Sequence, residues 1–172
     1  MKTYYINATI YRGGRFETGC LAVEDGRVVT AGEPWPGDRV ADLGGLCLVP
    51  GLVDVHVHLR EPGFEYKEDI NTGLEAAARG GFGSVMCMAN TKPVTDSPEV
   101  VRAVMEKAAA TGVTVLPVGA VTKGLSGAEL TDFAALKEAG APALSDDGVP
   151  IQDEELLRRA LEEAKTVGLP IL

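Results

Sequence analysis

The sequence predicts an α/β protein whose parallel strands form part of a (β/α)₈ barrel, preceded by a short region of antiparallel strands. From Leu52 onward, apolar strands alternate with longer amphipathic helices, a pattern typical of parallel strands joined by right-handed crossovers. Polar side chains follow the ends of the predicted strands, where barrel enzymes gather their catalytic groups. The competing fold, an open doubly wound sheet that binds a dinucleotide, lacks its glycine fingerprint, because Gly80-Gly81-Phe82-Gly83 precedes a strand and not a helix.

Composition places the chain among globular proteins and argues against two classes of partner. Of its 172 residues, 45% are hydrophobic and 24% are charged, which is enough apolar content to bury a core. No apolar run approaches the roughly 20 residues that span a bilayer, and the net charge of −9 works against binding nucleic-acid phosphates. Three scattered cysteines without a C-x-x-C motif predict reduced thiols and a cytoplasmic location.

The N-terminal region contains short alternating or β-branched runs separated by turn residues. We expect these runs to form short antiparallel strands, because proline, Asp-Gly and Gly-Gly favour tight turns between strands. The runs are TYYINATIY, CLAVEDGRVV and RVADLGGLCLV, and the turn residues are Asp25-Gly26, Pro34, Pro36 and Gly44-Gly45.

The barrel-type region is predicted to contain apolar strands separated by capped helices. The strands are expected at residues 52–59, 83–89, 114–121 and 141–147, with a fifth beginning at 169–172. The first helix is expected at residues 66–79 and the last at 153–167. The expected helix-end signals are Ser97-Pro98 and Gly112 for the second helix, Thr131 and Gly140 for the third, and Gly168 for the last. Polar residues then follow the ends of four predicted strands, and their gathering at one rim favours the barrel. These residues are His58 and Arg60, Asn90, Thr122-Lys123, and Asp146-Asp147.

The chain has two histidines, and both lie in the stretch DVHVHLREPG. Side chains alternate along a strand, so His56 and His58 point the same way and can converge on one metal ion. Val55 and Val57 are expected on the opposite face, in the layer beneath the helices. Asp54 shares the histidine face and is expected to orient one of the rings. The alternative is a pair of packing or surface histidines, but their place at the end of a buried strand favours metal.

Two histidines leave a catalytic zinc site incomplete, since such sites usually have three protein ligands. Asp146 and Asp147, in the sequence SDDG, are candidates for the remaining carboxylate, although Asp-Asp-Gly is also ordinary turn chemistry. Arg60 shares the histidine face if the first strand continues that far, and its guanidinium would suit a substrate carboxylate or phosphate. Its alternative is a salt bridge to Glu61 or Glu65. Asn90 can donate and accept hydrogen bonds, which suits a substrate amide or carboxylate. The alternative is that it only caps a loop.

The strings PGLVDVHVHLREPG, EDINTGLEAAARGGFGSVMCMANTKP and SDDG resemble the bacterial dihydroorotases of the amidohydrolase superfamily. The resemblance runs from about Leu48 to the end of the chain. It implies a small N-terminal β-sandwich domain at residues 1–50 and the first half of a (β/α)₈ barrel at 51–172. It also implies one or two zinc ions, with His56 and His58 on one ion and Asp147 bridging the two. Arg60 and Asn90 would hold the α-carboxylate of the substrate.

The resemblance implies the reversible cyclisation of N-carbamoyl-L-aspartate to L-dihydroorotate in pyrimidine (UMP) biosynthesis. It leaves open a homodimer or a complex with aspartate transcarbamoylase. The family uses two further histidines and a proton-shuttling aspartate on later strands, and this chain has no other histidine. We therefore expect the chain to be the N-terminal part of a longer enzyme, and we assign none of its residues as the catalytic proton carrier.

Two alternatives to a dihydroorotase remain. An allantoinase or hydantoinase usually bridges its metals with a carboxylated lysine at the end of the fourth strand, where Asp147 stands here. A catalytically inactive scaffold for a partner enzyme would tend to lose ligands, whereas every ligand expected within these residues is present. Both observations favour the enzyme.

Overall fold

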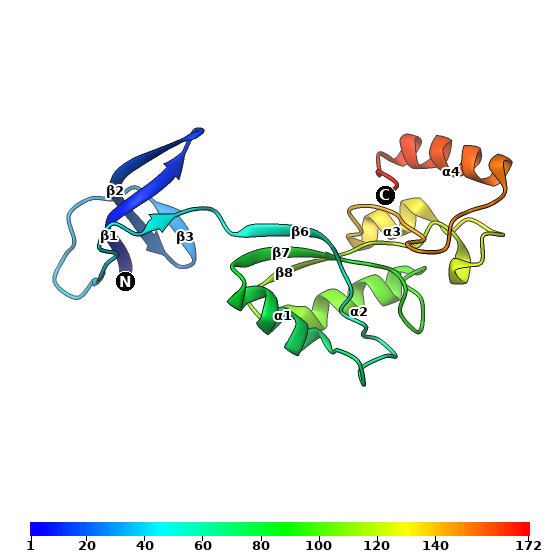
Figure 1. The fold of residues 1–172 in the computed structure, drawn as a ribbon, viewed down its shortest axis with the longest axis horizontal. Coiled ribbons are helices and arrows are strands. Elements are labelled where there is room, and N and C mark those ends of the chain that lie inside the picture. The colour runs from blue at the N-terminus through cyan, green and yellow to red at the C-terminus, as the bar shows by residue number, and fades with distance from the viewer. The chain divides into compact units, whose positions relative to one another are not determined.

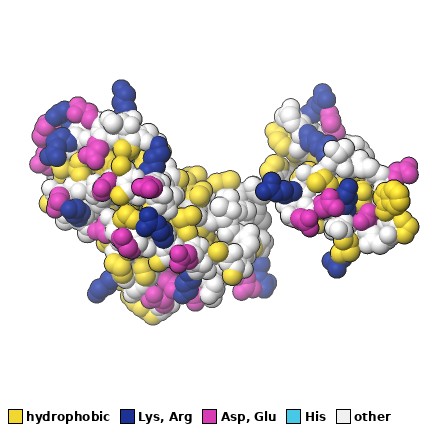
Figure 2. Space-filling model, turned by 180° about the vertical axis from the view of Figure 1, so that it is seen from behind, with side chains coloured by type: hydrophobic (Ala, Val, Ile, Leu, Met, Phe, Trp, Pro, Cys, Tyr) yellow, Lys and Arg dark blue, Asp and Glu magenta, His cyan; other side chains and the backbone are white.

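A computed structural model describes all residues from 1 to 172, which divide into two compact units, Met1–Pro50 and Gly51–Leu172 (Figure 1). Strands and helices occur together in the chain, so the predicted mixed α/β class is confirmed. None of the helices combines the length and the apolar character that crossing a membrane requires. Figure 2 shows acidic and basic side chains interspersed on the visible face of each unit, with hydrophobic side chains exposed between them.

The first unit is built on one five-stranded sheet. Its strand order is β3-β2-β1-β4, and β5 also pairs with β1. The first two connections are two-residue hairpin turns at Gly13-Gly14 and Asp25-Gly26, where both residues of each turn have positive φ, as a type I′ turn requires. The strands are β1 Lys2–Arg12, β2 Arg15–Glu24, β3 Arg27–Val29, β4 Arg39–Asp42 and β5 Cys47–Leu48.

The prediction that all these strands are antiparallel is wrong for two of them. β1 pairs with β2 in antiparallel fashion, but β4 and β5 both run parallel to β1. The cause is the connection at residues 30–38, which carries the chain from β3 on one edge of the sheet to the far side of β1. Local turn residues indicate where a strand ends, but they do not reveal which neighbour the next strand will join.

The second unit is centred on a parallel sheet in the order β6-β7-β8 (Figure 1). Helices α1 and α2 lie on one side of this sheet, and α3 and α4 follow it in the chain. The strands are β6 Leu52–Val57, β7 Phe82–Cys87 and β8 Thr114–Pro117. The helices are α1 Ile70–Arg79, α2 Pro98–Ala108, α3 Phe133–Ala139 and α4 Glu154–Val167, with a short 3-10 helix η1 at Lys123–Leu125.

Helix α4, the start of α2 and the predicted ends of α1 at Arg79 and of α3 at Gly140 are confirmed. The starts of α1 and α3 and the end of α2 differ from prediction. α1 begins at Ile70 and not at residue 66, because the Asp69 carboxylate accepts the backbone N–H of Thr72 and caps the helix there. α2 ends at Ala108, before Gly112, because the backbone N–H and the hydroxyl of Thr111 both donate to the Ala108 carbonyl.

The third helix is capped by Asp132 and not by Thr131. The Asp132 carboxylate accepts the N–H of Ala135, at 2.9 Å. The hydroxyl of Thr131 instead donates to the carbonyl of Ala120, at 2.7 Å, and so ties the start of the helix to the segment after β8. Either residue type can cap a helix, so sequence alone could not choose between neighbours.

The predicted fourth and fifth strands are present only as isolated parallel bridges. Leu144 pairs with Gly119 on one side and with Ile171 on the other, which continues the parallel order beyond β8. Longer pairing does not form because the backbone N–H groups of Val121 and Thr122 donate to the Asp146 side chain and not to a neighbouring strand.

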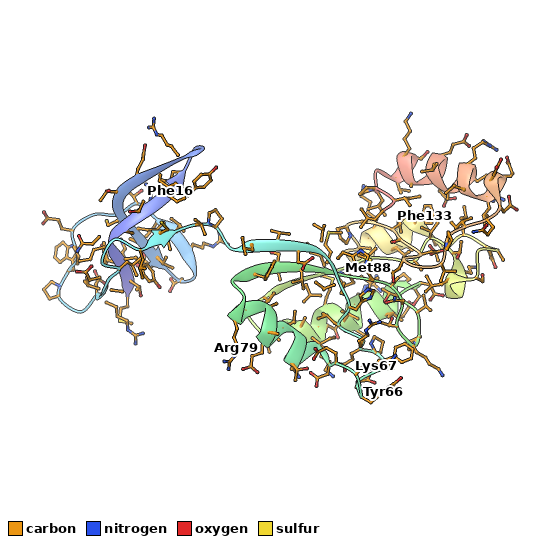
Figure 3. All side chains as sticks on the ribbon, viewed as in Figure 1. Phe16, Tyr66, Lys67, Arg79, Met88 and Phe133 are labelled. Atoms are coloured by element: carbon orange, nitrogen blue, oxygen red, sulfur yellow. The ribbon has the colours of Figure 1, made fainter.

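Three clusters of buried side chains form the core of the second unit, and the smallest consists of Met88, Val118 and Ala143. Of the two larger clusters, the first lies between the sheet and helices α1 and α2, and the second surrounds α3 and α4 and includes Phe133 (Figure 3). The principal members are Leu59, Ile70, Leu74, Val85, Val104 and Val115 in the first, and Phe133, Leu136, Leu144 and Ala160 in the second. The expectation that Val55 lies beneath the helices is wrong: it is 57% exposed, because α1 contacts β7, α2 contacts β8 and no helix contacts β6. Val57 is only partly buried.

Candidate metal centre

Two histidines and one aspartate converge beyond the carboxyl end of β6. Potential ligand atoms of His56, His58 and Asp147 all lie within 4.8 Å of one another. Nε2 of His56 is 3.2 Å from Oδ1 of Asp147, and Nε2 of His58 is 3.9 Å from Oδ2 of the same carboxylate. The centroids of the two imidazole rings are 5.2 Å apart, and the ring planes are inclined by 72°.

The histidines are positioned by the pairing of β6 with β7, which reaches the last residue of β6. Val57 pairs with Cys87, and the N–H of Met88 donates to the Val57 carbonyl at 3.0 Å. Val57 packs against the core, so its neighbours His56 and His58 turn to the other side. Leu59 is buried again and fixes the chain immediately after the pair.

Asp146 and Asp147 are directed to different partners. The Asp146 carboxylate is buried, and it accepts the N–H of Val121 at 2.8 Å and both the N–H and the hydroxyl of Thr122. Asp147 adopts a left-handed backbone with φ of +50° and extends its carboxylate to the histidines. The backbone N–H of Asp147 donates to the Ser145 hydroxyl at 2.9 Å. Asp147 is therefore the carboxylate free to take a ligand role.

Asn90 connects the histidine pair to Asp147. It follows β7, and its side-chain oxygen is 3.0 Å from Nδ1 of His58. Its amide nitrogen donates a hydrogen bond to Oδ2 of Asp147. The sequence indicated Asn90 as a candidate substrate-binding residue. No spacing rule indicated that it would contact both His58 and Asp147.

Arg60 does not lie on the strand face that it would share with the histidines if β6 continued to residue 60. β6 ends at Val57, and Arg60 has a left-handed backbone with φ of +63°, so strand alternation does not apply to it. The predicted alternative, a salt bridge to Glu61 or Glu65, is also wrong. Glu61 instead pairs with Lys107 and accepts the N–H of Ile70, while Glu65 accepts the N–H of Gly63. The Arg60 guanidinium therefore has no carboxylate partner within the chain.

The loops that carry Arg60 and Asn90 are joined directly. The N–H of Lys92 donates to the carbonyl of Pro62 at 2.8 Å. Gly63 has a φ of +94°, and a Cβ atom at this position would lie 2.1 Å from the carbonyl oxygen of Lys92. Only glycine permits this close approach, which holds the two loops side by side.

Asp54 has a different role from the one predicted. Its carboxylate accepts the backbone N–H of His56 at 3.0 Å, so it fixes the backbone of the strand and does not contact an imidazole. Thr122 and Lys123, the polar pair after β8, also stay outside the cluster. Thr122 is hydrogen-bonded to Asp146, and Lys123 forms an ion pair with Glu129.

The donor set of the cluster fits a zinc ion. Two imidazole nitrogens and one carboxylate oxygen are typical of catalytic zinc sites that have three protein ligands and an open position. Both histidines direct Nε2 toward Asp147, so the same ring nitrogen is available from each. The carboxylate adds a negative charge, which favours a divalent cation over a neutral ligand.

Comparison with known proteins places the chain in a family. A family model described as dihydro-orotase-like matches residues 45–171. The dihydroorotase of Desulforapulum autotrophicum is 49% identical over 158 residues, and that of Geobacter sulfurreducens is 51% identical over 156 residues. Each match covers 88% of this chain and 37% of the relative, so the chain spans just over a third of the length of these relatives.

Among solved structures, the L-hydantoinase (dihydropyrimidinase) of Arthrobacter aurescens is similar with a TM-score of 0.83 and 20% identity, covering 98% of this chain and 39% of that one. A D-hydantoinase gives a TM-score of 0.74 at 23% identity, covering 99% of this chain and 39% of that one. At such low identity these likenesses establish the fold alone. The family match and the high identity to the curated relatives together show that the chain belongs to the dihydroorotase-like family.

Proposed function

We propose that the protein containing this chain is a zinc-dependent dihydroorotase, which interconverts N-carbamoyl-L-aspartate and L-dihydroorotate in pyrimidine biosynthesis. The observation that carries the proposal is the convergence of His56, His58 and Asp147 in a chain about half identical to dihydroorotases. In this proposal Nε2 of each histidine and the carboxylate of Asp147 hold zinc. Bound zinc supplies Lewis-acid polarisation of the amide carbonyl and lowers the pKa of water toward about 7.

The chain's own residues would bind and orient the substrate. Arg60 has a guanidinium without a carboxylate partner, on a loop fixed to the loop that carries Asn90. A bidentate contact from Arg60 to the α-carboxylate, with a hydrogen bond from the Asn90 amide, would hold the scissile amide beside the histidines and Asp147. The proton carrier is proposed to be an aspartate outside these 172 residues.

We also propose that the second unit forms the first half of a (β/α)₈ barrel. The parallel order of β6, β7 and β8, continued by the bridges from Gly119 to Leu144 and from Leu144 to Ile171, supports this arrangement. The polar cluster lies beyond the carboxyl ends of these strands, where barrel enzymes carry their active sites. We propose that the first unit contributes to a small β-sandwich domain, with its five-stranded sheet as one layer.

The test is an assay of the full-length protein with three substrates: L-dihydroorotate, hydantoin and allantoin. Ring opening of L-dihydroorotate, lost on treatment with a chelator and restored by zinc, is the expected result. Activity with hydantoin or allantoin but not with L-dihydroorotate would overturn the proposal. A protein that binds zinc and opens none of the three rings would instead fit the inactive scaffold.

Association with other chains is a separate proposal. The resemblance to dihydroorotases supports a homodimer or a complex with aspartate transcarbamoylase. Light scattering of the full-length protein, alone and with the transcarbamoylase from the same organism, tests both. A monomer under both conditions would contradict them without affecting the proposed reaction.

A further inference from the structure

We infer that Asn90 is a positioning residue for the metal ligands, in addition to any contact it makes with substrate. Its side chain lies between His58 and Asp147, which belong to different segments of the chain. The inference rests on the proposed metal site, but it concerns a residue that is not a ligand. Asn90 would select the tautomer of His58 and hold the carboxylate of Asp147 toward the histidines.

The hydrogen-bonding capacities of the three groups determine the tautomer. The ionised Asp147 carboxylate can only accept hydrogen bonds, so the –NH₂ end of Asn90 must face it. The carbonyl end of Asn90 then faces His58, at 3.0 Å from Nδ1. A carbonyl only accepts, so Nδ1 must carry the proton, and in a neutral imidazole Nε2 is left with its lone pair. Nε2 is the atom directed toward Asp147 and available to a metal.

The backbone around Asn90 is held firmly enough for this role. The preceding residues Met88 and Ala89 are buried, and the Ala89 carbonyl accepts the N–H groups of both Thr91 and Thr95, at 2.8 and 3.0 Å. Figure 3 shows Met88 in the interior of the second unit, just past β7. A fixed backbone allows a short side chain to orient its neighbours, because little conformational freedom is lost when the hydrogen bonds form.

The amide also has capacity left for a substrate. An –NH₂ group has two hydrogens, and one of them is used by Asp147. The second can meet a substrate carboxylate, so the positioning role and the substrate role are compatible. They differ in one measurable respect, because a residue that only binds substrate has no influence on zinc affinity when substrate is absent.

The first test compares zinc affinities by competition with a chromophoric chelator, without substrate. We expect Asn90→Ala to weaken zinc binding by about 10- to 100-fold, the effect typical of losing a group that orients a metal ligand. The matched control is Asn71→Ala, at an exposed position on α1, which should leave the affinity unchanged. An affinity of Asn90→Ala equal to that of the unaltered protein would overturn the inference. No zinc binding by the unaltered protein would instead contradict the proposed function.

The second test reads the tautomer in the zinc-free protein by two-bond ¹H–¹⁵N NMR correlations of the imidazole nitrogens. The unaltered protein should show His58 with the proton on Nδ1. Asn90→Ala, which removes the acceptor oxygen that faces Nδ1, should yield a mixture of the two tautomers. A proton on Nε2 in the unaltered protein would refute the inference even if Asn90→Ala fails to fold.

Discussion

The carboxylates of Asp146 and Asp147 serve different partners although the two residues are adjacent. Asp146 accepts three hydrogen bonds from Val121 and Thr122, and Asp147 lies 3.2 Å from Nε2 of His56. The first carboxylate anchors the turn to the segment after β8, and the anchored turn directs the second carboxylate to the histidines. One residue therefore supports the fold of the site, and the next is the proposed metal ligand.

Substitution of these two aspartates should separate stability from zinc binding. Asp146→Ala leaves buried N–H groups of Val121 and Thr122 without partners, at a cost of about 1–3 kcal/mol each. It should lower the melting temperature of the zinc-free protein. Asp147→Asn should leave that temperature nearly unchanged but abolish the rise that zinc produces in the unaltered protein. Calorimetry of both variants with and without zinc provides the measurement. Equal losses of stability in both variants would contradict the assignment of a structural role to Asp146 and a metal-binding role to Asp147.

Removal of one histidine should eliminate zinc binding and turnover together. His58→Ala leaves His56 and Asp147, two of the three ligand groups that converge here. We expect zinc content to fall below one equivalent and L-dihydroorotate hydrolysis to disappear in the full-length variant. Metal analysis of the dialysed protein, alongside the assay, provides the measurement. A variant that retained both zinc and activity would contradict the ligand assignment.

Arg60→Lys should weaken substrate binding while leaving the metal in place. A lysine keeps the charge but loses the guanidinium fork that contacts a carboxylate through two parallel hydrogen bonds. Hydrogen bonds to charged groups contribute about 1.5–3 kcal/mol, so we expect KM to rise about 10-fold or more. Arg79→Lys is the control, because Arg79 is exposed on α1 (Figure 3). Its guanidinium pairs with Glu75 and not with a group of the candidate site. An unchanged KM with Arg60→Lys would show that Arg60 does not hold the substrate.

Cys87 should make the folded protein less stable at high pH. Burial raises the pKa of its thiol from 9.0 to about 12, so the folded state keeps the proton where the unfolded state releases it. The contribution of this thiol to the free energy of unfolding is complete below pH 9. It is lost as pH rises toward 12, by about 1.4 kcal/mol per pH unit. Denaturant titrations between pH 8 and 11 should show this slope. Cys87→Ala should reduce it, and Cys47→Ala, at an exposed thiol, should not; equal slopes in all three proteins would contradict the assignment.

The sequence predicted the parts of the fold that depend on local pattern. Apolar periodicity located β6, β7 and β8, and cap residues located both ends of α4. Pairing between distant segments could not be predicted in the same way. The parallel placement of β4 beside β1 depends on where a long connection leads, and the loss of the predicted fourth strand depends on a side chain, Asp146, replacing strand partners.

The candidate site also contains features that local sequence pattern predicts and features that depend on contacts between distant residues. The i, i+2 spacing brought His56 and His58 to one side without knowledge of any contact. The choice of Asp147 over Asp146 came from family resemblance, and its physical basis is visible only in the hydrogen bonds of Asp146. The bridge from Asn90 to His58 and Asp147 joins residues 32 and 57 positions apart, and no local pattern specifies contacts at such separations.

The most direct test of the metal centre is an anomalous-scattering map from crystals of the protein grown with zinc, recorded on both sides of the zinc absorption edge. We expect a strong peak within bonding distance, about 2.0–2.2 Å, of Nε2 of His56, Nε2 of His58 and a carboxylate oxygen of Asp147. A map with no peak at these three residues, or with zinc bound only at Cys47 or at surface carboxylates, would contradict it.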